Sequence, residues 1–93
     1  MATTAVLVRI SGRVQGVGYR AWAETEAVTL GLSGWVRNRR DGTVEAMVAG
    51  PQRDVDAFVA RCRSGPRSAT VTGIVTEPHA GPQAAGFTVL PTA

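Results

Sequence analysis

The hydrophobic pattern of the chain switches repeatedly between two periods, and this alternation limits the folds that it can adopt. Apolar and β-branched residues recur at every second position over residues 5–11, which is typical of a strand. Over residues 19–30 they recur at every third or fourth position, as on one face of an amphipathic helix. Gly31 indicates the end of this helix, because glycine readily adopts the left-handed conformation of a C-terminal cap.

The remainder of the chain continues the same alternation. Further strands are expected at residues 33–39, 43–49 and 69–77, with a short closing strand at residues 87–90. Asp41-Gly42, between the first two of these strands, is a strong signal for a tight hairpin turn. Pro51 suits the first turn of a second amphipathic helix, which Gly65-Pro66 ends.

The resulting order, strand-helix-strand-strand-helix-strand with a short final strand, predicts an α+β fold of the ferredoxin-like, split βαβ type. We expect a four-stranded antiparallel sheet, a short extra C-terminal strand and two helices on one face. In this topology the first and third strands are neighbours, and the second strand lies beside the third. The 93 residues contain no repeat and no linker, so residues 1–93 are expected to form a single domain.

The charge and the cysteine content narrow the classes of function. All ten basic residues are arginine, and with seven acidic residues they give a net charge of +3, too weak to predict nucleic-acid binding. No apolar run approaches the ~20 residues of a membrane span, and the N-terminus lacks the pattern of a signal peptide. Cys62 is the single cysteine and cannot form an internal disulfide bond, so we expect a cytoplasmic protein with Cys62 in the core.

Residues for metal binding or acid–base catalysis are scarce. With one histidine and one cysteine, the chain is not expected to hold a Cys/His metal cluster, and we expect no cofactor. His79 lies beside Pro78 in a loop rich in proline and glycine, where an exposed residue is expected rather than part of a catalytic triad. Glu24 and Glu26 lie two positions apart on the first helix and do not face each other. We expect the acidic residues to be solvated.

A glycine-rich segment, residues 12–20, lies between the first strand and the first helix. Its glycines allow a tight turn in which several main-chain N–H groups point into one small space. The following helix adds free N–H groups and the positive end of its dipole. Arg20 in the first helical turn offers a planar guanidinium that suits phosphoryl oxygens. The segment predicts an anion site without metal, although a tight turn followed by a solvated arginine fits the same pattern.

A second informative segment, residues 34–44, contains Asn38 near the end of an expected strand. Asparagine is disfavoured inside strands, so one interpretation is a turn residue ahead of the hairpin. In the other interpretation, its carboxamide holds a water molecule in a fixed orientation, because this group both donates and accepts hydrogen bonds. The predicted topology allows Asn38 to approach the glycine-rich segment.

These two segments together resemble the signatures of the acylphosphatase family. The second signature comprises Gly34-Trp35-Val36-Arg37-Asn38 followed by Gly42, Val44 and Gly50, and further matches are Pro51, Val55, Phe58 and Gly65-Pro66. The resemblance covers nearly the whole chain and is weakest over residues 77–86. It implies a ferredoxin-like fold and the metal-free hydrolysis of the carboxyl-phosphate bond of acyl phosphates.

The resemblance also implies the roles of individual residues. Arg20 matches the phosphate-binding arginine of the family, and Asn38 matches its water-positioning asparagine. The phosphate loop corresponds to Gln15, Gly16, Val17, Gly18 and Tyr19. The expected partners are a small acyl phosphate and inorganic phosphate, as product or inhibitor, bound by a monomer that takes neither nucleic acid nor membrane.

Two other functions fit a domain of this fold. Ferredoxin-like modules that bind nucleic acid stack bases on aromatic residues of their strands, but the expected first and third strands carry no aromatic residue. A non-catalytic phosphate-binding module, such as an accessory domain of a larger protein, remains the second alternative.

Overall fold

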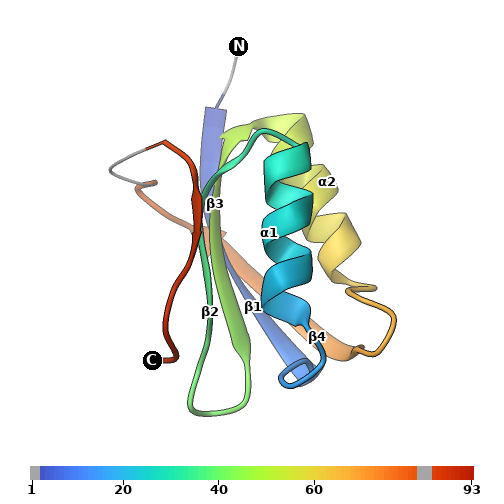
Figure 1. The fold of residues 1–93 in the computed structure, drawn as a ribbon. Coiled ribbons are helices and arrows are strands. Elements are labelled where there is room, and N and C mark those ends of the chain that lie inside the picture. Colours follow the sequence, from blue (N-terminus) through green and yellow to red (C-terminus); the bar gives the residue numbers. More distant parts are fainter. Residues whose placement is uncertain (1–2, 82–84) are drawn as a thin grey trace.

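The computed structural model describes residues 3–81 and 85–93, and within them the elements follow the predicted order (Figure 1). The strands are β1 (Thr3–Arg13), β2 (Ser33–Asn38), β3 (Val44–Pro51), β4 (Thr70–Pro78) and β5 (Phe87–Val89). The helices are α1 (Tyr19–Thr29) and α2 (Gln52–Cys62). No helix in the two described ranges is both long and apolar enough to cross a membrane.

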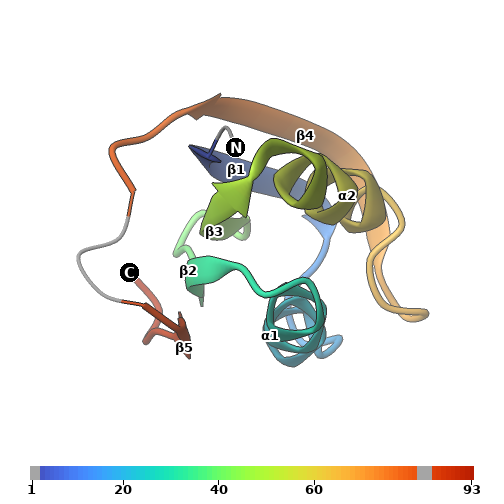
Figure 2. The same cartoon turned by 90° about the horizontal axis from the view of Figure 1, so that it is seen from above.

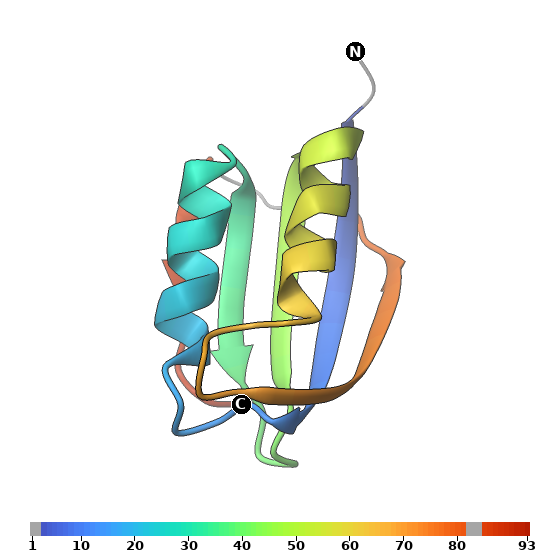
Figure 3. The same ribbon diagram turned by 90° about the vertical axis from the view of Figure 1, so that its right-hand side faces the viewer.

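The strands form one sheet in the order β4-β1-β3-β2-β5. The first four of these pair in an antiparallel manner, and both helices cover the same face of the sheet (Figure 2, Figure 3). This arrangement confirms the predicted ferredoxin-like α+β fold. The short C-terminal strand β5 pairs with β2 in parallel, so the complete sheet is five-stranded and mixed.

β1 is longer than predicted, because it continues to Arg13 through an irregularity between Ser11 and Gly12. Gly12 has a φ of +123°, and a Cβ atom at this position would collide with the carbonyl oxygen of Thr70 on β4. A side chain is therefore incompatible with the close approach of β4 at this point. As a result, β1 and β4 stay paired up to the loop that leads to α1.

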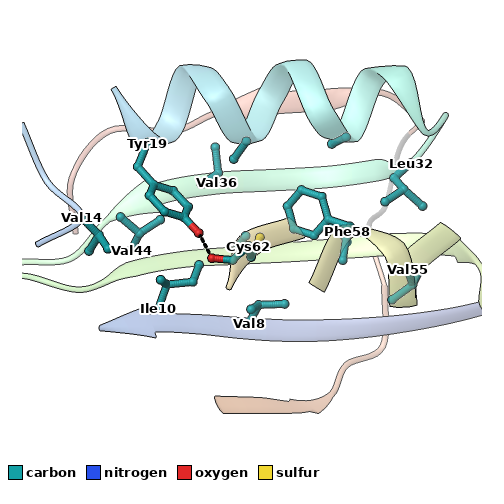
Figure 4. Packing of buried hydrophobic residues seen from close by; sticks show 14 residues of the cluster. Val8, Ile10, Val14, Tyr19, Leu32, Val36, Val44, Val55, Phe58 and Cys62 are labelled. Atoms are coloured by element: carbon teal, nitrogen blue, oxygen red, sulfur yellow. Dashed lines mark hydrogen bonds between the residues drawn. The ribbon is translucent and has the colours of Figure 1, made fainter. Parts of the chain in front are cut away.

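The hydrophobic core lies between the helices and the sheet (Figure 4). Val8, Ile10 and Val36 face it from the strands and Phe58 faces it from α2, all without exposed surface. Burial of such apolar surface is the main favourable contribution to the stability of a small domain. Because side chains alternate along a strand, Val36 places Asn38, two positions later, on the same side of β2 as the helices.

Tyr19 at the start of α1 connects the two helices. Its side chain is buried, and its hydroxyl donates a hydrogen bond of 2.6 Å to the carbonyl oxygen of Cys62 at the end of α2 (Figure 4). Burial, together with the neighbouring Cys62, raises the pKa of Tyr19 above its ordinary value. Trp22 packs edge-to-face against Tyr19, with the ring centroids 5.2 Å apart. The predicted core position of Cys62 is confirmed.

The opposite face of the sheet carries a buried carboxylate, Glu45 on β3. Nitrogen atoms of Arg37, Arg9 and Arg39 lie 2.8, 3.3 and 3.6 Å from its oxygens. Burial raises the pKa of Glu45, but hydrogen bonds from Arg37 and Arg9 outweigh burial, and the pKa is lowered. The expectation that the acidic residues are solvated is therefore wrong for Glu45. Three of the ten arginines surround this one carboxylate, which offsets only part of their positive charge.

Candidate active site

The loop between β1 and α1 owes its shape to two glycines. Gly16 and Gly18 have φ values of +72° and +81°, in the left-handed region that strains other residues, although the space around both is open. Gly18 is also the N-cap of α1 and offers no side chain to the free N–H groups of the first helical turn. These N–H groups remain available to a ligand, and the positive end of the helix dipole favours an anion there.

This loop borders a cavity of about 330 Å³ that also contains Arg20 of α1 and Asn38 at the end of β2. The lining residues are Val14, Gly16, Gly18, Tyr19, Arg20, Ala21, Glu24, Asn38 and Val89. The loop and α1 thus provide one wall, while β2 and β5 provide the other. The structure brings together the two residues that the sequence singled out from separate segments.

The predicted phosphate loop contributes only in part to the lining of this cavity. Gly16, Gly18 and Tyr19 line it, whereas Gln15 and Val17 do not. The side chain of Tyr19 is directed to the core, and Val17 packs against the core from the outside. The binding roles of these five residues stay a prediction, and for Tyr19 such a role falls to the main chain.

The side chain of Gln15 binds the hairpin between β2 and β3. Its Nε2 atom donates hydrogen bonds of 2.7 Å to the carbonyl oxygen of Arg39 and 2.9 Å to that of Thr43. Arg39 directly follows Asn38 in the chain, so Gln15 fixes the loop relative to the strand end that carries Asn38. This contact was not predictable from local sequence patterns, because α1 and β2 separate Gln15 from Thr43.

Two charged side chains of the described residues, Arg20 and Glu24, line the cavity. Within residues 3–81 and 85–93, the guanidinium of Arg20 has no hydrogen-bonding or ion-pair partner, unlike those of Arg37 and Arg61. Glu24 lies one helical turn after Arg20 and lines the same cavity, which the sequence analysis did not foresee. The four-residue spacing on α1 was the available signal, since residues at this spacing share one helix face.

The C-terminal segment completes the far wall of the cavity. Val89 of β5 lines it, and beyond β5 the chain stays beside β2, where the N–H of Leu90 donates to the carbonyl oxygen of Val36 at 2.8 Å. Further along, the N–H of Ala93 donates to the carbonyl oxygen of Asn38 at 3.0 Å. This pairing restrains the main chain of Asn38 from the side opposite to β3.

Among the described residues, no group of three His, Cys, Asp or Glu side chains is arranged to hold a metal ion. His79 is exposed and borders a different cavity of about 590 Å³, next to Thr3 and Gly50 at the end of the sheet remote from Asn38. Its Nδ1 accepts a hydrogen bond from the N–H of Gly81 at 3.0 Å. We place the functional site in the smaller cavity, because the larger one contains no arginine, lysine or carboxylate side chain.

Comparison with known proteins agrees with the fold and identifies a family. The family model "Acylphosphatase" matches residues 6–89. The acylphosphatase of Rhodospirillum rubrum is 53% identical over 87 residues, which cover 94% of this chain and 96% of the relative. The acylphosphatase structure from Bacillus subtilis has a TM-score of 0.88 and 32% identity, and covers 96% of this chain and 99% of its own. That from Coxiella burnetii has a TM-score of 0.90 and 31% identity, with coverages of 95% and 93%.

The fold and the cavity define a ferredoxin-like α+β protein with a glycine loop, an arginine and an asparagine at one site. The comparisons add that the chain resembles acylphosphatases in sequence and fold over most of its length. The chain belongs to the acylphosphatase family, which confirms the resemblance of its sequence motifs and the prediction of an acylphosphatase enzyme.

Proposed function

We propose that this protein hydrolyses the carboxyl-phosphate bond of acyl phosphates, giving a carboxylate and inorganic phosphate. The observation that carries the proposal is the single cavity of about 330 Å³ in which the glycine loop, Arg20 and Asn38 meet. Family membership supports the reaction class, and the geometry of the cavity supports the assignment of roles to these residues.

In the proposed mechanism, Arg20 and the main-chain N–H groups of the loop bind the phosphoryl group. The guanidinium of Arg20 has no protein partner among the described residues, so it is free to form two parallel hydrogen bonds with phosphoryl oxygens. Gly16 and Gly18 have the left-handed backbone in which successive main-chain N–H groups can converge on one anion. Together they offset negative charge on the three oxygens, which is the principal requirement in phosphoryl transfer.

Asn38 is the proposed positioning residue for the attacking water. Its carboxamide oxygen accepts a hydrogen bond from the water, which keeps a lone pair of the water directed at phosphorus. As the water oxygen bonds to phosphorus, the bond from phosphorus to the acyl oxygen breaks. The carboxylate leaves without a proton, because its conjugate acid has a pKa near ~4. A phosphate oxygen takes the proton of the water, so that an acyl phosphate dianion and water give a carboxylate and dihydrogen phosphate.

The remaining features of the proposal follow from the same chemistry. A good leaving group removes the need for a general acid, and the charge carried by Arg20 and the loop takes the place of a metal ion. We propose a monomer that acts in the cytoplasm, where the free thiol of the buried Cys62 stays reduced. Phosphate is expected to inhibit as a competitor for the same cavity.

Two non-catalytic functions would use the same fold differently. A phosphate-binding module would bind acyl phosphate without turnover. A nucleic-acid-binding module needs exposed aromatic residues on its central strands, and β1 and β3 carry none. We favour the enzyme because Asn38 lines the same cavity as Arg20 and the glycine loop, and mere binding of an anion does not require a carboxamide.

The proposed function is tested by steady-state hydrolysis of benzoyl phosphate in the presence and absence of EDTA. We expect turnover that is unaffected by EDTA and competitively inhibited by inorganic phosphate. Binding of phosphate without turnover would identify a binding module, and loss of activity in EDTA would contradict the metal-free mechanism.

A further inference from the structure

The cavity extends beyond the expected position of the phosphoryl group, between α1 and β5. Glu24 follows Arg20 by one helical turn, and Val89 of β5 pairs with Val36, two positions before Asn38. α1 and β2 run in opposite directions (Figure 1). Residues later in α1 and residues earlier in β2 therefore lie toward the same end of the sheet. Glu24 and Val89 therefore lie on one side of the Arg20–Asn38 pair and define a second part of the cavity.

Of the four glutamates, Glu26 and Glu45 have arginine partners among the described residues, whereas Glu24 and the exposed Glu77 do not, and of these two only Glu24 lines the cavity. Glu26 pairs with Arg61 at 3.4 Å, and Glu45 is surrounded by three arginines. Glu24 is half-buried and has no hydrogen bond or ion pair to any residue in 3–81 or 85–93. An uncompensated carboxylate in the wall of a cavity repels a second negative charge nearby, and the low-dielectric walls strengthen this repulsion.

We propose that Glu24 and Val89 form the acyl part of the site, and that Glu24 selects against acyl groups that carry a further negative charge. The inference rests on the proposed function, in which Arg20 and the loop bind the phosphoryl group. Arg20 and the loop N–H groups offset the phosphoryl charges, but an additional carboxylate or phosphate on the acyl group would face Glu24. The preferred substrates are acyl phosphates with an uncharged acyl group, which contacts the 37%-exposed side chain of Val89.

The charge selection is tested with two substrates that differ by one distant charge, benzoyl phosphate and 4-carboxybenzoyl phosphate. The ratio of their kcat/KM values is measured for the wild type, for Glu24→Gln and for Glu77→Gln. Glu77 is an exposed residue of β4, at the opposite edge of the sheet, so its substitution removes the same charge far from the cavity. Measurements at low and high ionic strength show whether the effect is electrostatic.

We expect the wild type and Glu77→Gln to prefer benzoyl phosphate, and Glu24→Gln to reduce this preference by about three- to tenfold at low salt. The reduction should be smaller at high salt. An equal ratio of kcat/KM values for the two substrates in Glu24→Gln and in the wild type would overturn the inference. If the wild type hydrolyses benzoyl phosphate in that case, the proposed function still holds. Hydrolysis of neither substrate by the wild type would contradict the proposed function itself, and this inference with it.

The contact with Val89 is tested by Val89→Thr, which keeps the shape of the side chain and adds a hydroxyl. We expect KM for benzoyl phosphate to rise about threefold while KM for the much smaller acetyl phosphate changes little. Val75→Thr on β4 is the control, because Val75 is 67% exposed and outside the cavity. An equal change of KM for both substrates, or the same change in the control, would overturn the placement of the acyl group.

Discussion

Arg20 and Asn38 line the same cavity although one belongs to the first turn of α1 and the other to the last position of β2. The βαβ connection explains this proximity. The glycine loop delivers Arg20 to the end of the sheet at which β2 finishes, and Gln15 fixes the loop to the hairpin that follows Asn38. Kinetic measurements can distinguish the role of Arg20 in binding the phosphoryl group from the role of Asn38 in turnover.

Replacement of Asn38 by alanine is expected to affect turnover rather than binding. The loss of a positioned hydrogen-bonding group commonly lowers kcat by about 10²–10³-fold, and Asn38 has this role for water in the proposed mechanism. Inhibition by inorganic phosphate should persist, because Arg20 and the loop remain. The measurement is kcat together with the inhibition constant of phosphate. Loss of phosphate inhibition with unchanged kcat would show that the two roles are wrongly assigned.

Gln15→Met should destabilise the protein and loosen the site, because the thioether has a similar length but cannot donate to two carbonyl oxygens. The two hydrogen bonds are worth about 1–3 kcal/mol together in the free energy of unfolding. The control is Gln52→Met, which removes an exposed hydrogen bond from Gln52 to Asp56 within α2. Urea unfolding and kcat/KM report both effects. Equal stability of the two variants would contradict a structural role for Gln15.

The buried ion cluster of Glu45 predicts a specific response to acid. The pKa of Glu45 is lowered in the folded protein, so its contribution to stability is complete above its unfolded pKa of about 4.5 and is lost as the pH falls through the lowered value. We expect the free energy of unfolding of the wild type to fall below about pH 4.5, and that of Glu45→Gln to depend less on pH over the same range. Parallel pH profiles for the two proteins would contradict this account.

The thiol of Cys62 is predicted to be unreactive in the folded protein. Burial raises its pKa to about 12, so the reactive thiolate is nearly absent at pH 8. A thiol reagent such as Ellman's reagent should modify Cys62 only as fast as the protein unfolds, and completely in denaturant. Rapid modification of the native protein would contradict the core position of this residue.

The sequence predicted the elements well, because each has a local signal. Hydrophobic periodicity marked the strands and helices, and Asp41-Gly42 marked the hairpin, so the strand order of a known topology could be anticipated. The site was predicted as far as it depends on this topology and on the two motifs. The extension of β1 to Arg13 was not predicted, because it depends on the contact of Gly12 with β4.

Features that depend on distant residues were missed for a physical reason. Glu45 gave no sign of burial, since only the strand register places Arg9 and Arg37 beside it. Val89 lines the cavity through the parallel pairing of β5 with β2, which three residues of strand do not reveal. Glu24 lines it from α1, where its four-residue spacing from Arg20 was the available signal. Side-chain contacts between separate elements require coordinates, whereas periodicity and turn signals do not.

The most direct test of the central claim is the hydrolysis of benzoyl phosphate by Arg20→Ala, compared with the wild type and with Arg53→Ala. Arg53 is an exposed residue of α2 outside the cavity, so its substitution removes the same charge without touching the site. We predict that Arg20→Ala folds normally and loses about 10³–10⁵-fold in kcat/KM, whereas Arg53→Ala retains nearly wild-type activity. A folded Arg20→Ala variant that hydrolyses benzoyl phosphate as fast as Arg53→Ala would contradict the account.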